Sequence, residues 1–355
     1  MNGTLQPAFS ERNIPVVFSA NEQFAPIFSV MLQSLVENAS PDNNYDILML
    51  SRDISVTYWN MLISMVENYP NVSLRLIDVT EWLDGYTFFT ENRETITIET
   101  YFRLLMPELL VNYEKAIYLD GDMIMNADVA ELYQIELEDN LLISSIDCDS
   151  IGCYHKADMV LKEYRDQVLK LKDPDGYFCA GMLVMNLDLF RKEFTNKQLL
   201  DFAASYQWRQ HDQDVLNVLC NGRTKLISPA WNLLRDAGNN KYMPSNLYEE
   251  FLAAEKDPKI IHYGGMRKPW LYLDVERGEF FWRYAGKTPF YKQILSMVGA
   301  ANAARWRGLP TNGVAGVAQS TVKDVALRQF SEGKIGMKYI FKYIKAWFRF
   351  KLKRH

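Results

Sequence analysis

Short apolar runs recur along most of the chain and are separated by polar segments, a pattern that predicts buried β-strands. Helix-period patterns lie between several of these runs, over residues 56–68 and 95–110 and after residue 24. Strands that alternate with helices favour an α/β fold with a doubly wound, mostly parallel sheet. The predicted strands cover residues 14–19, 45–50, 73–78, 115–119, 141–146, 177–187 and 259–263.

The first of these units reads as a strand, a polar turn and a helix that presents Phe28, Met31, Leu32 and Leu35. This order is the opening of a nucleotide-binding βα unit. The turn lacks the glycine-rich fingerprint G-x-G-x-x-G, so we do not expect a dinucleotide-binding fold of the usual kind.

Two acids follow directly on the apolar run at residues 115–119, in the sequence Asp120-Gly121-Asp122. They would stand at the carboxyl end of a strand, which is where open α/β sheets bind ligands. With glycine between them, both carboxylates can face one divalent cation, whose open positions can take a diphosphate. Asp-Gly between apolar runs is also typical of a hairpin turn, and this window alone does not separate the two.

Two further polar features are candidates for a site. His211-Asp212-Gln213-Asp214 opens a predicted helix, and its pattern slightly favours a helix cap over a cluster aimed at a ligand. Residues 262–270 read His-Tyr-Gly-Gly-Met-Arg-Lys-Pro-Trp, which suits a loop folded over an anion. Arg103 has the position of an ordinary solvated charge. Residues 147–176 suit a flap over the sheet edge.

Composition narrows the class of protein. The 355 residues are 48% hydrophobic with a net charge of −5, which disfavours a disordered chain and a general nucleic-acid binder. The four cysteines show no Cys-x-x-Cys spacing and are predicted to be reduced and mostly buried. We see no secretory signal and no apolar run of about 18 residues, so the sequence predicts a cytoplasmic protein.

The end of the chain differs from the rest. Residues 334–355 carry eight Lys and Arg, no acid and many aromatic residues. Since the whole chain has a net charge of −5 and this segment carries +8, the rest of the chain has a net charge of −13 and would repel nucleic acid. The segment predicts a helical tail on an anionic membrane surface, at the inner face of the plasma membrane, with a packed helix or an RNA-binding tail as alternatives. We divide the chain into a catalytic domain, 1–298, and a C-terminal helical region, 299–355.

The chain resembles family 8 glycosyltransferases in three motifs and in their order. These motifs are Asp120-Gly121-Asp122, Asp212-Gln213-Asp214 and the His-Tyr-Gly-Gly-Met-Arg-Lys-Pro-Trp segment. These retaining enzymes include bacterial lipopolysaccharide galactosyl- and glucosyltransferases. The resemblance covers residues 14–290 and implies a nucleotide-diphospho-sugar transferase fold. It also implies Mn²⁺, with Mg²⁺ as the alternative, a UDP-glucose or UDP-galactose donor, and a glycan or lipid-linked acceptor in the cell envelope.

The resemblance assigns roles residue by residue. The metal ligands would be Asp120, Asp122 and His262. The diphosphate would lie on Gly265 and Lys268, and the nucleoside on Ser19, Ala20, Asn21 and Gln23. Arg103 would reach the donor sugar or phosphate, Asp212 would bind sugar hydroxyls, and Gln213 would lie beside the anomeric carbon. The chain departs from the family at Asn21, where an acid is frequent, and at Cys179, where asparagine is common and a thiol hydrogen-bonds less well.

A glutamine beside the anomeric carbon is a poor nucleophile. We therefore favour front-face substitution, in which the leaving phosphate takes the acceptor proton, over a covalent route through Asp212 or Asp214. One rival is a haloacid dehalogenase-type phosphatase, whose Asp-x-Asp normally continues with Gly-Thr and not with Met123-Ile124. The other is a nucleotide-sugar-binding protein without turnover, which the intact set of predicted metal and diphosphate residues disfavours.

Overall fold

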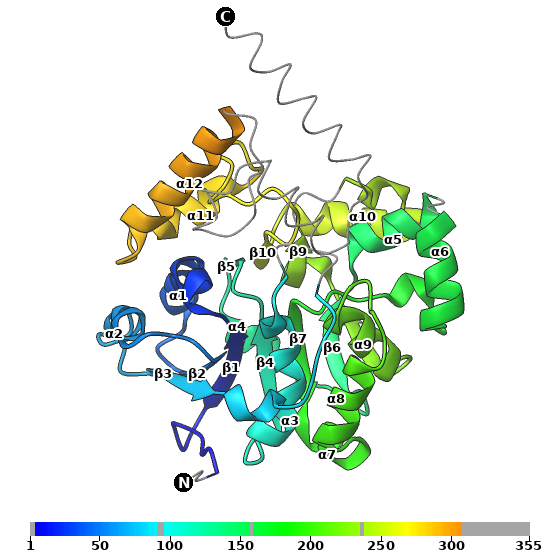
Figure 1. The fold of residues 1–355 in the computed structure, drawn as a ribbon, viewed down its shortest axis with the longest axis horizontal. Helices are drawn as coiled ribbons and strands as arrows, with labels where there is room; N and C mark the ends of the chain where they lie inside the picture. The colour runs from blue at the N-terminus through cyan, green and yellow to red at the C-terminus, as the bar shows by residue number, and fades with distance from the viewer. Residues whose placement is uncertain (1–3, 91–95, 157–158, 235–237, 307–355) are drawn as a thin grey trace, which may run out of the picture.

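A seven-stranded sheet lies at the centre of the computed structural model, which describes residues 4–90, 96–156, 159–234 and 238–306 (Figure 1). The strand order is β3-β2-β1-β4-β7-β6-β8. Only β7 runs antiparallel to its neighbours in this sheet, so the predicted α/β fold with a mostly parallel sheet is confirmed. The strands are β1 (Asn13–Ser19), β2 (Asn44–Ser51), β3 (Val72–Asp78), β4 (Lys115–Leu119), β6 (Leu142–Ser145), β7 (Met182–Asn186) and β8 (Thr224–Ile227).

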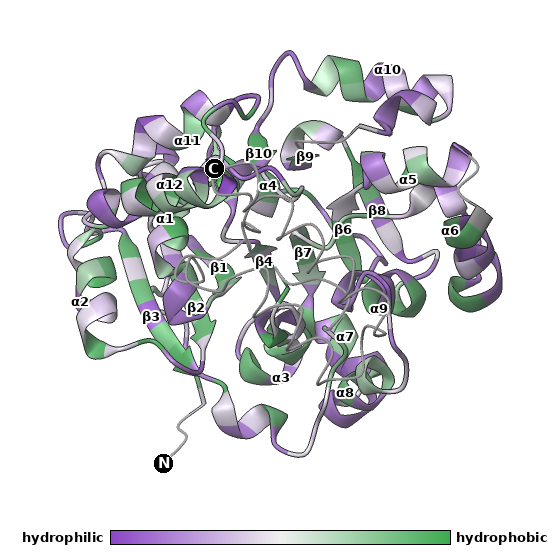
Figure 2. Cartoon of the chain, turned by 45° about the horizontal axis from the view of Figure 1, so that its top comes forward, coloured by the Kyte–Doolittle hydropathy of each residue, from purple (hydrophilic) through white to green (hydrophobic). Residues whose placement is uncertain are grey.

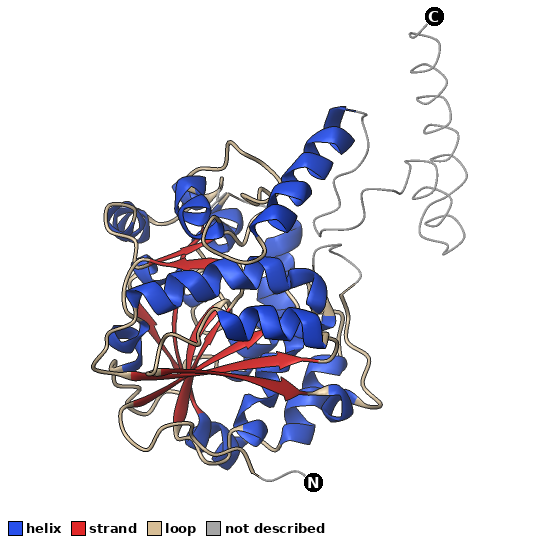
Figure 3. Ribbon diagram, turned by 90° about the vertical axis from the view of Figure 1, so that its left-hand side faces the viewer, coloured by secondary structure: helices blue, strands red, loops and turns tan. Residues whose placement is uncertain are grey.

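The central strands are apolar on both faces because helices cover both sides of the sheet (Figure 3). The interior residues of β1, β2 and β4 are all buried, and these strands are among the hydrophobic segments at the centre of Figure 2. Continuous apolar runs of this kind are what the sequence shows, and they explain why the strands could be predicted. The α-helices are α1 (Ala25–Asn38), α2 (Val56–Ser64), α3 (Met106–Leu109), α4 (Val129–Tyr133), α5 (Cys148–His155), α6 (Met159–Tyr164), α7 (Leu187–Glu193), α8 (Asn196–Ala204), α9 (Asp212–Leu219), α10 (Ser245–Ala254), α11 (Gly278–Ala285) and α12 (Tyr291–Trp306).

Shorter helical turns complete the connections. The segment predicted as a helix over 95–110 is mostly a 3₁₀ helix, η3, followed by the single turn α3. These turns are η1 (Glu22–Phe24), η2 (Thr80–Leu83), η3 (Ile98–Leu105), the π-helical η4 (Arg165–Leu169), η5 (Pro174–Gly176), η6 (Pro229–Asn232) and η7 (Asn240–Tyr242).

A second, three-stranded sheet decides between the two interpretations of Asp120-Gly121-Asp122. It consists of β5 (Met123–Met125), β10 (Ile260–His262) and β9 (Leu233–Leu234), in the order β5-β10-β9. The segment after β4 leaves the large sheet and enters β5, which pairs with β10 and not with β4. The acids therefore lie where the chain passes between two sheets, and not in a hairpin.

The C-terminal prediction concerns residues 299–355, of which 307–355 lie outside the described part of the chain. Helix α12 is the last described element and runs through the proposed boundary at residue 298, so the division into two regions stays a prediction. The basic segment 334–355 lies entirely beyond it. Among the residues that the structure describes, no helix is long and apolar enough to span a bilayer.

Candidate active site

A pocket of about 850 Å³ lies at the carboxyl ends of β1 and β4, the edge at which a site was expected. It brings together almost all the residues that the resemblance singled out. Gln23 is the exception, because it lies exposed in η1 and does not line the pocket. The predicted residues that line it are Ser19, Ala20, Asn21, Arg103, Asp120, Asp122, Asp212, Gln213, His262, Gly265 and Lys268.

Two carboxylates and one imidazole form the centre of the pocket. Ligand atoms of Asp120, Asp122 and His262 all lie within 4.8 Å of one another. The Nε2 atom of His262 is 3.2 Å from Oδ1 of Asp122 and 3.8 Å from Oδ2 of Asp120. Strand pairing brings them together, since His262 in β10 lies opposite Met123 in β5. A donor set of two oxygens and one nitrogen suits a divalent transition metal such as Mn²⁺.

Two glycines leave room for this cluster. A Cβ atom at Gly181 would lie 2.6 Å from Cε1 of His262 and 2.8 Å from Oδ2 of Asp120. A Cβ atom at Gly264 would lie 2.9 Å from Nε2 of His262. Any side chain at either position would displace the ligand atoms, so the chain around them fits a metal site.

Lys268 adds a cation to the cluster, with its Nζ atom 2.7 Å from Oδ2 of Asp122. Burial alone would raise the pKa of Asp122, but Lys268 and His262 together hold that pKa well below its usual range. For His262, burial alone would lower the pKa, whereas the carboxylate of Asp122 raises it to about 10. Without a metal, the cluster is therefore a network of mutually stabilised charges.

Arg103 is buried, so the interpretation as a solvated surface charge is wrong. Its side chain is 3% exposed and lies over the ring of Tyr118. Nη2 is 2.9 Å from Oδ1 of Asp120, and Nε is 2.9 Å from Oδ2 of Asp212. Helix η3 packs against β1 and thereby turns this face of the helix toward the pocket. The guanidinium thus joins a candidate metal ligand to the acid predicted to bind the donor sugar.

Residues 211–213, at the start of α9, line the pocket. His211, the residue before the helix, makes no side-chain capping bond and has a positive φ of 55°, which is strained for a non-glycine residue. Asp212 accepts a short hydrogen bond from the hydroxyl of Thr100 and pairs with Arg103. Burial raises the pKa of Asp212 to about 6, although Arg103 and Thr100 act to lower it. The preference for a simple helix cap is therefore wrong for Asp212.

Gln213 is held at both ends of its amide. Oε1 accepts a hydrogen bond from the backbone N–H of Ala180 at 3.0 Å, and Nε2 donates to Oδ2 of Asp147 at 2.8 Å. Asp214 is 1% exposed, and its two carboxylate oxygens accept hydrogen bonds from the hydroxyls of Tyr177 and Tyr164. Asp214 does not line the pocket, so its carboxylate is in no position to attack a bound donor.

Asp147 is a pocket residue that the sequence analysis missed. It follows β6 and caps α5, with Oδ1 accepting from the backbone N–H of Ser150 and Oδ2 holding Gln213. Burial raises the pKa of this carboxyl group. An acid directly after a buried strand was the available signal, the same one that identified Asp120. Residues of α5 beyond it also line the pocket, as expected of a flap.

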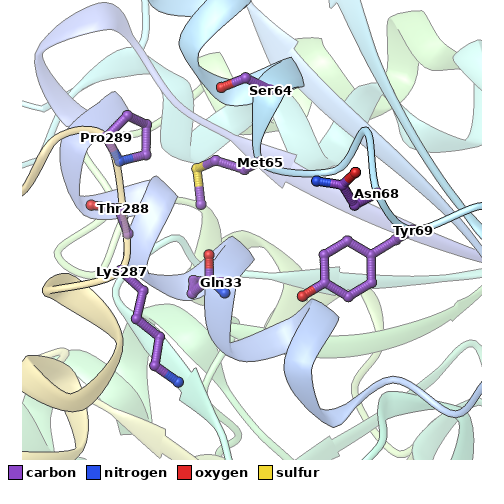
Figure 4. Close-up of a pocket in the computed structure, with 8 residues that line it drawn as sticks. All are labelled: Gln33, Ser64, Met65, Asn68, Tyr69, Lys287, Thr288 and Pro289. Carbon is purple, nitrogen blue, oxygen red and sulfur yellow. The ribbon is translucent and has the colours of Figure 1, made fainter.

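The cysteines are free, as predicted, and three of the four are buried. Cys179 lines the pocket, with its Sγ atom 3.9 Å from Nδ1 of His262. A second hollow, of about 700 Å³, shares no lining residue with the pocket (Figure 4). Polar groups of Gln33, Ser64 and Asn68 lie around it, and Lys287 at its edge pairs with Glu37.

Comparisons with known proteins give a consistent result. The model of the family described as "Glycosyl transferase family 8" matches residues 15–274. A putative glycosyltransferase of Haemophilus influenzae is 26% identical over 264 residues, which cover 72% of each chain. Glycosyltransferase GlyB of Streptococcus pneumoniae is 24% identical over 76% of this chain and 61% of its own length.

Two solved structures share the fold. The WbbM bifunctional glycosyltransferase matches with a TM-score of 0.76 and 29% identity, over 83% of this chain and 53% of its own. The galactosyltransferase LgtC, solved with donor and acceptor sugar analogs, matches with a TM-score of 0.63 and 24% identity, over 78% of this chain and 96% of its own. The chain thus spans about half the length of the WbbM chain. Its sheet and helices are those of a nucleotide-sugar transferase.

Proposed function

The chain belongs to glycosyl transferase family 8, and we propose that it transfers glucose or galactose from a UDP-sugar to a glycan or lipid-linked acceptor, with retention at the anomeric carbon. The observation that carries this proposal is the cluster of Asp120, Asp122 and His262 beside Lys268, at the sheet edge that binds ligands in such folds. A phosphatase is not compatible with the family. LgtC, a galactosyltransferase by its description, supports galactose as the first donor to test.

We assign the donor site from the residues present. Asp120, Asp122 and His262 would hold the metal, Mn²⁺ or Mg²⁺, and the metal when bound would offset the charge of the leaving diphosphate. Lys268 would move from Asp122 to the diphosphate, since its ammonium group is a mobile point charge. Gly265, which also lines the pocket, would let the backbone approach the phosphates closely.

The nucleoside would lie at the end of β1. Ser19, Ala20 and Asn21 line the pocket there, and Oδ1 of Asn21 accepts a hydrogen bond from the backbone N–H of Phe24. The side-chain oxygen of Asn21 is therefore already engaged by the chain. We assign the contact with the nucleoside to the backbone of this turn and to the side chain of Ser19, which lines the pocket next to Tyr118.

The contacts of Gln213 support front-face substitution. Both ends of its amide are engaged, so it can orient the sugar but is not free to swing and form a bond. Asp212 is paired with Arg103 and suits hydrogen bonding to sugar hydroxyls better than attack on carbon. The leaving phosphate then remains as the group that accepts the proton of the acceptor hydroxyl.

The test of the proposal is release of UDP from a panel of UDP-sugars, with Mn²⁺ and with a chelator. We expect slow, metal-dependent release from one sugar even without acceptor. UDP binding with no release from any sugar would favour a binding protein without turnover. Failure to bind UDP at all would contradict the proposed donor site.

Metal affinity should depend steeply on pH. His262 has a raised pKa of about 10 in the metal-free chain, and its Nε2 atom must lose a proton before it can bind a metal. Apparent Mn²⁺ affinity should therefore rise by about tenfold per pH unit below that pKa, or roughly 100-fold from pH 6 to pH 8. Titration calorimetry at a series of pH values measures this slope.

The stability of the metal-free chain should fall as the pH rises, whereas the affinity for the metal rises. A histidine whose pKa is higher in the folded than in the unfolded chain stabilises the fold fully below its unfolded pKa of about 6.5. That contribution is lost as the pH rises toward about 10. We expect the melting temperature to fall over this range without metal and the loss to be smaller with Mn²⁺. A flat profile in both conditions would mean that His262 is not paired as the structure shows.

A further inference from the structure

We propose that Asn232 is a positioning residue for the metal site, because it fixes the orientation and the protonated nitrogen of His262. This inference rests on the proposed function, since it assigns His262 a metal. Asn232 is 2% exposed and His262 is 4% exposed, and Oδ1 of Asn232 lies 2.9 Å from Nδ1 of His262.

The chemistry of imidazole gives this contact its meaning. The Nε2 atom faces the carboxylates of Asp120 and Asp122, so it is the nitrogen that would bind the metal through its lone pair. In neutral imidazole the proton must then be on Nδ1, which needs an acceptor. Oδ1 of Asn232 is that acceptor, while the other contact of Nδ1 among the described residues is with the weakly bonding Sγ of Cys179, at 3.9 Å. A partner of this kind typically fixes the ring of a metal-bound histidine.

The fold holds Asn232 in place from both sides. It is the last residue of η6, whose first residue is Pro229 and whose start is capped by the hydroxyl of Ser228. It directly precedes β9, which pairs parallel to β10, with Leu234 opposite His262. The imidazole is thus presented by β10, and the amide by the turn that leads directly into the neighbouring strand β9 of the same small sheet.

The amide nitrogen of Asn232 indicates that asparagine at this position does not serve the stability of the fold. Nδ2 of Asn232 is buried and has no hydrogen-bond partner among the described residues. A buried donor without a partner destabilises the folded chain, so a residue of the same size without that donor would remove this cost. The amide oxygen toward His262 is the contact that asparagine provides and leucine does not.

The test measures the affinity of the chain for Mn²⁺ in the absence of any sugar nucleotide. The electron paramagnetic resonance signal of free Mn²⁺ reports how much of the ion is bound. We expect Asn232→Leu to weaken Mn²⁺ binding by about 10- to 100-fold. Asn232→Asp keeps an acceptor for the Nδ1 proton and should bind Mn²⁺ at least ten times more tightly than Asn232→Leu.

Asn38→Leu is the matched control. The Nδ2 atom of Asn38 donates to the carbonyl oxygens of Ser34 and Met125 and to the hydroxyl of Tyr284, so its loss should lower the melting temperature. We expect that variant to lose more stability than Asn232→Leu and yet to keep wild-type Mn²⁺ affinity. This contrast separates a positioning role from a merely structural one.

The outcomes are distinct. Wild-type Mn²⁺ affinity in Asn232→Leu, or equal weakening in the leucine and aspartate variants, would overturn the inference and leave the proposed function intact. If the wild-type chain binds no Mn²⁺ while it binds UDP, both the metal site and the role of Asn232 are wrong.

Discussion

Replacing Asp122 by alanine should abolish metal-dependent UDP release. Asp122 is the carboxylate that contacts both cations of the cluster, His262 at 3.2 Å and Lys268 at 2.7 Å. Its loss removes one of three candidate ligands and leaves two cations without their shared anion. We expect kcat/KM to fall by at least ~10³-fold, equivalent to about 4 kcal/mol of transition-state stabilisation. The measurement compares initial rates of UDP release with Mn²⁺ and with a chelator.

Asp188→Ala is the matched control for this substitution. Asp188 lies at the start of α7, pairs with Arg191 and is half-exposed, and it does not line the pocket. Its loss should leave the rate unchanged. If Asp122→Ala kept metal-dependent release with an unchanged circular dichroism spectrum, the metal would bind elsewhere, and the assignment of the cluster would have to be abandoned.

The site residues that could be predicted from the sequence pattern are those that directly follow a buried strand. Asp120 and Asp122 could be predicted because a buried strand must stop where polar residues begin, and that point lies at the ligand-binding edge. The direction of β7 could not be predicted, since an apolar run has the same pattern whether it runs parallel or antiparallel to its neighbours. The pairing of β5 with β10, which brings His262 to the two acids, joins segments far apart in the chain.

The sequence pattern did not predict the roles of side chains whose contacts lie far away in the chain. Arg103 has the local pattern of a surface charge, and only the fold brings the two acids to either side of it. Asn232 has no local signal at all, because a single asparagine before two leucines fits any turn. The resemblance to a family supplied His262 and Arg103 as candidates, but it did not say that Arg103 would join Asp120 to Asp212.

Arg103→Met should be strongly destabilising because it leaves a buried acid without its cation. Arg103 and Asp212 have side chains that are 3% and 4% exposed, and breaking a buried pair from one side typically costs about 3–5 kcal/mol. Methionine keeps most of the side-chain volume, so the expected loss is electrostatic and does not come from a cavity. Chemical denaturation of the metal-free chain measures the free energy of unfolding.

A double variant tests the cause of that loss. Asp212→Asn in the Arg103→Met background removes the stranded charge, so it should recover part of the lost stability, whereas two independent losses would add. Arg223→Met is the matched control, since Arg223 pairs with Glu193 at the surface, and such pairs contribute only about 0–1 kcal/mol. If Arg103→Met were no more destabilising than Arg223→Met, the carboxyl of Asp212 would have to be protonated in the variant, and a stranded charge could not be the cause of any loss of stability.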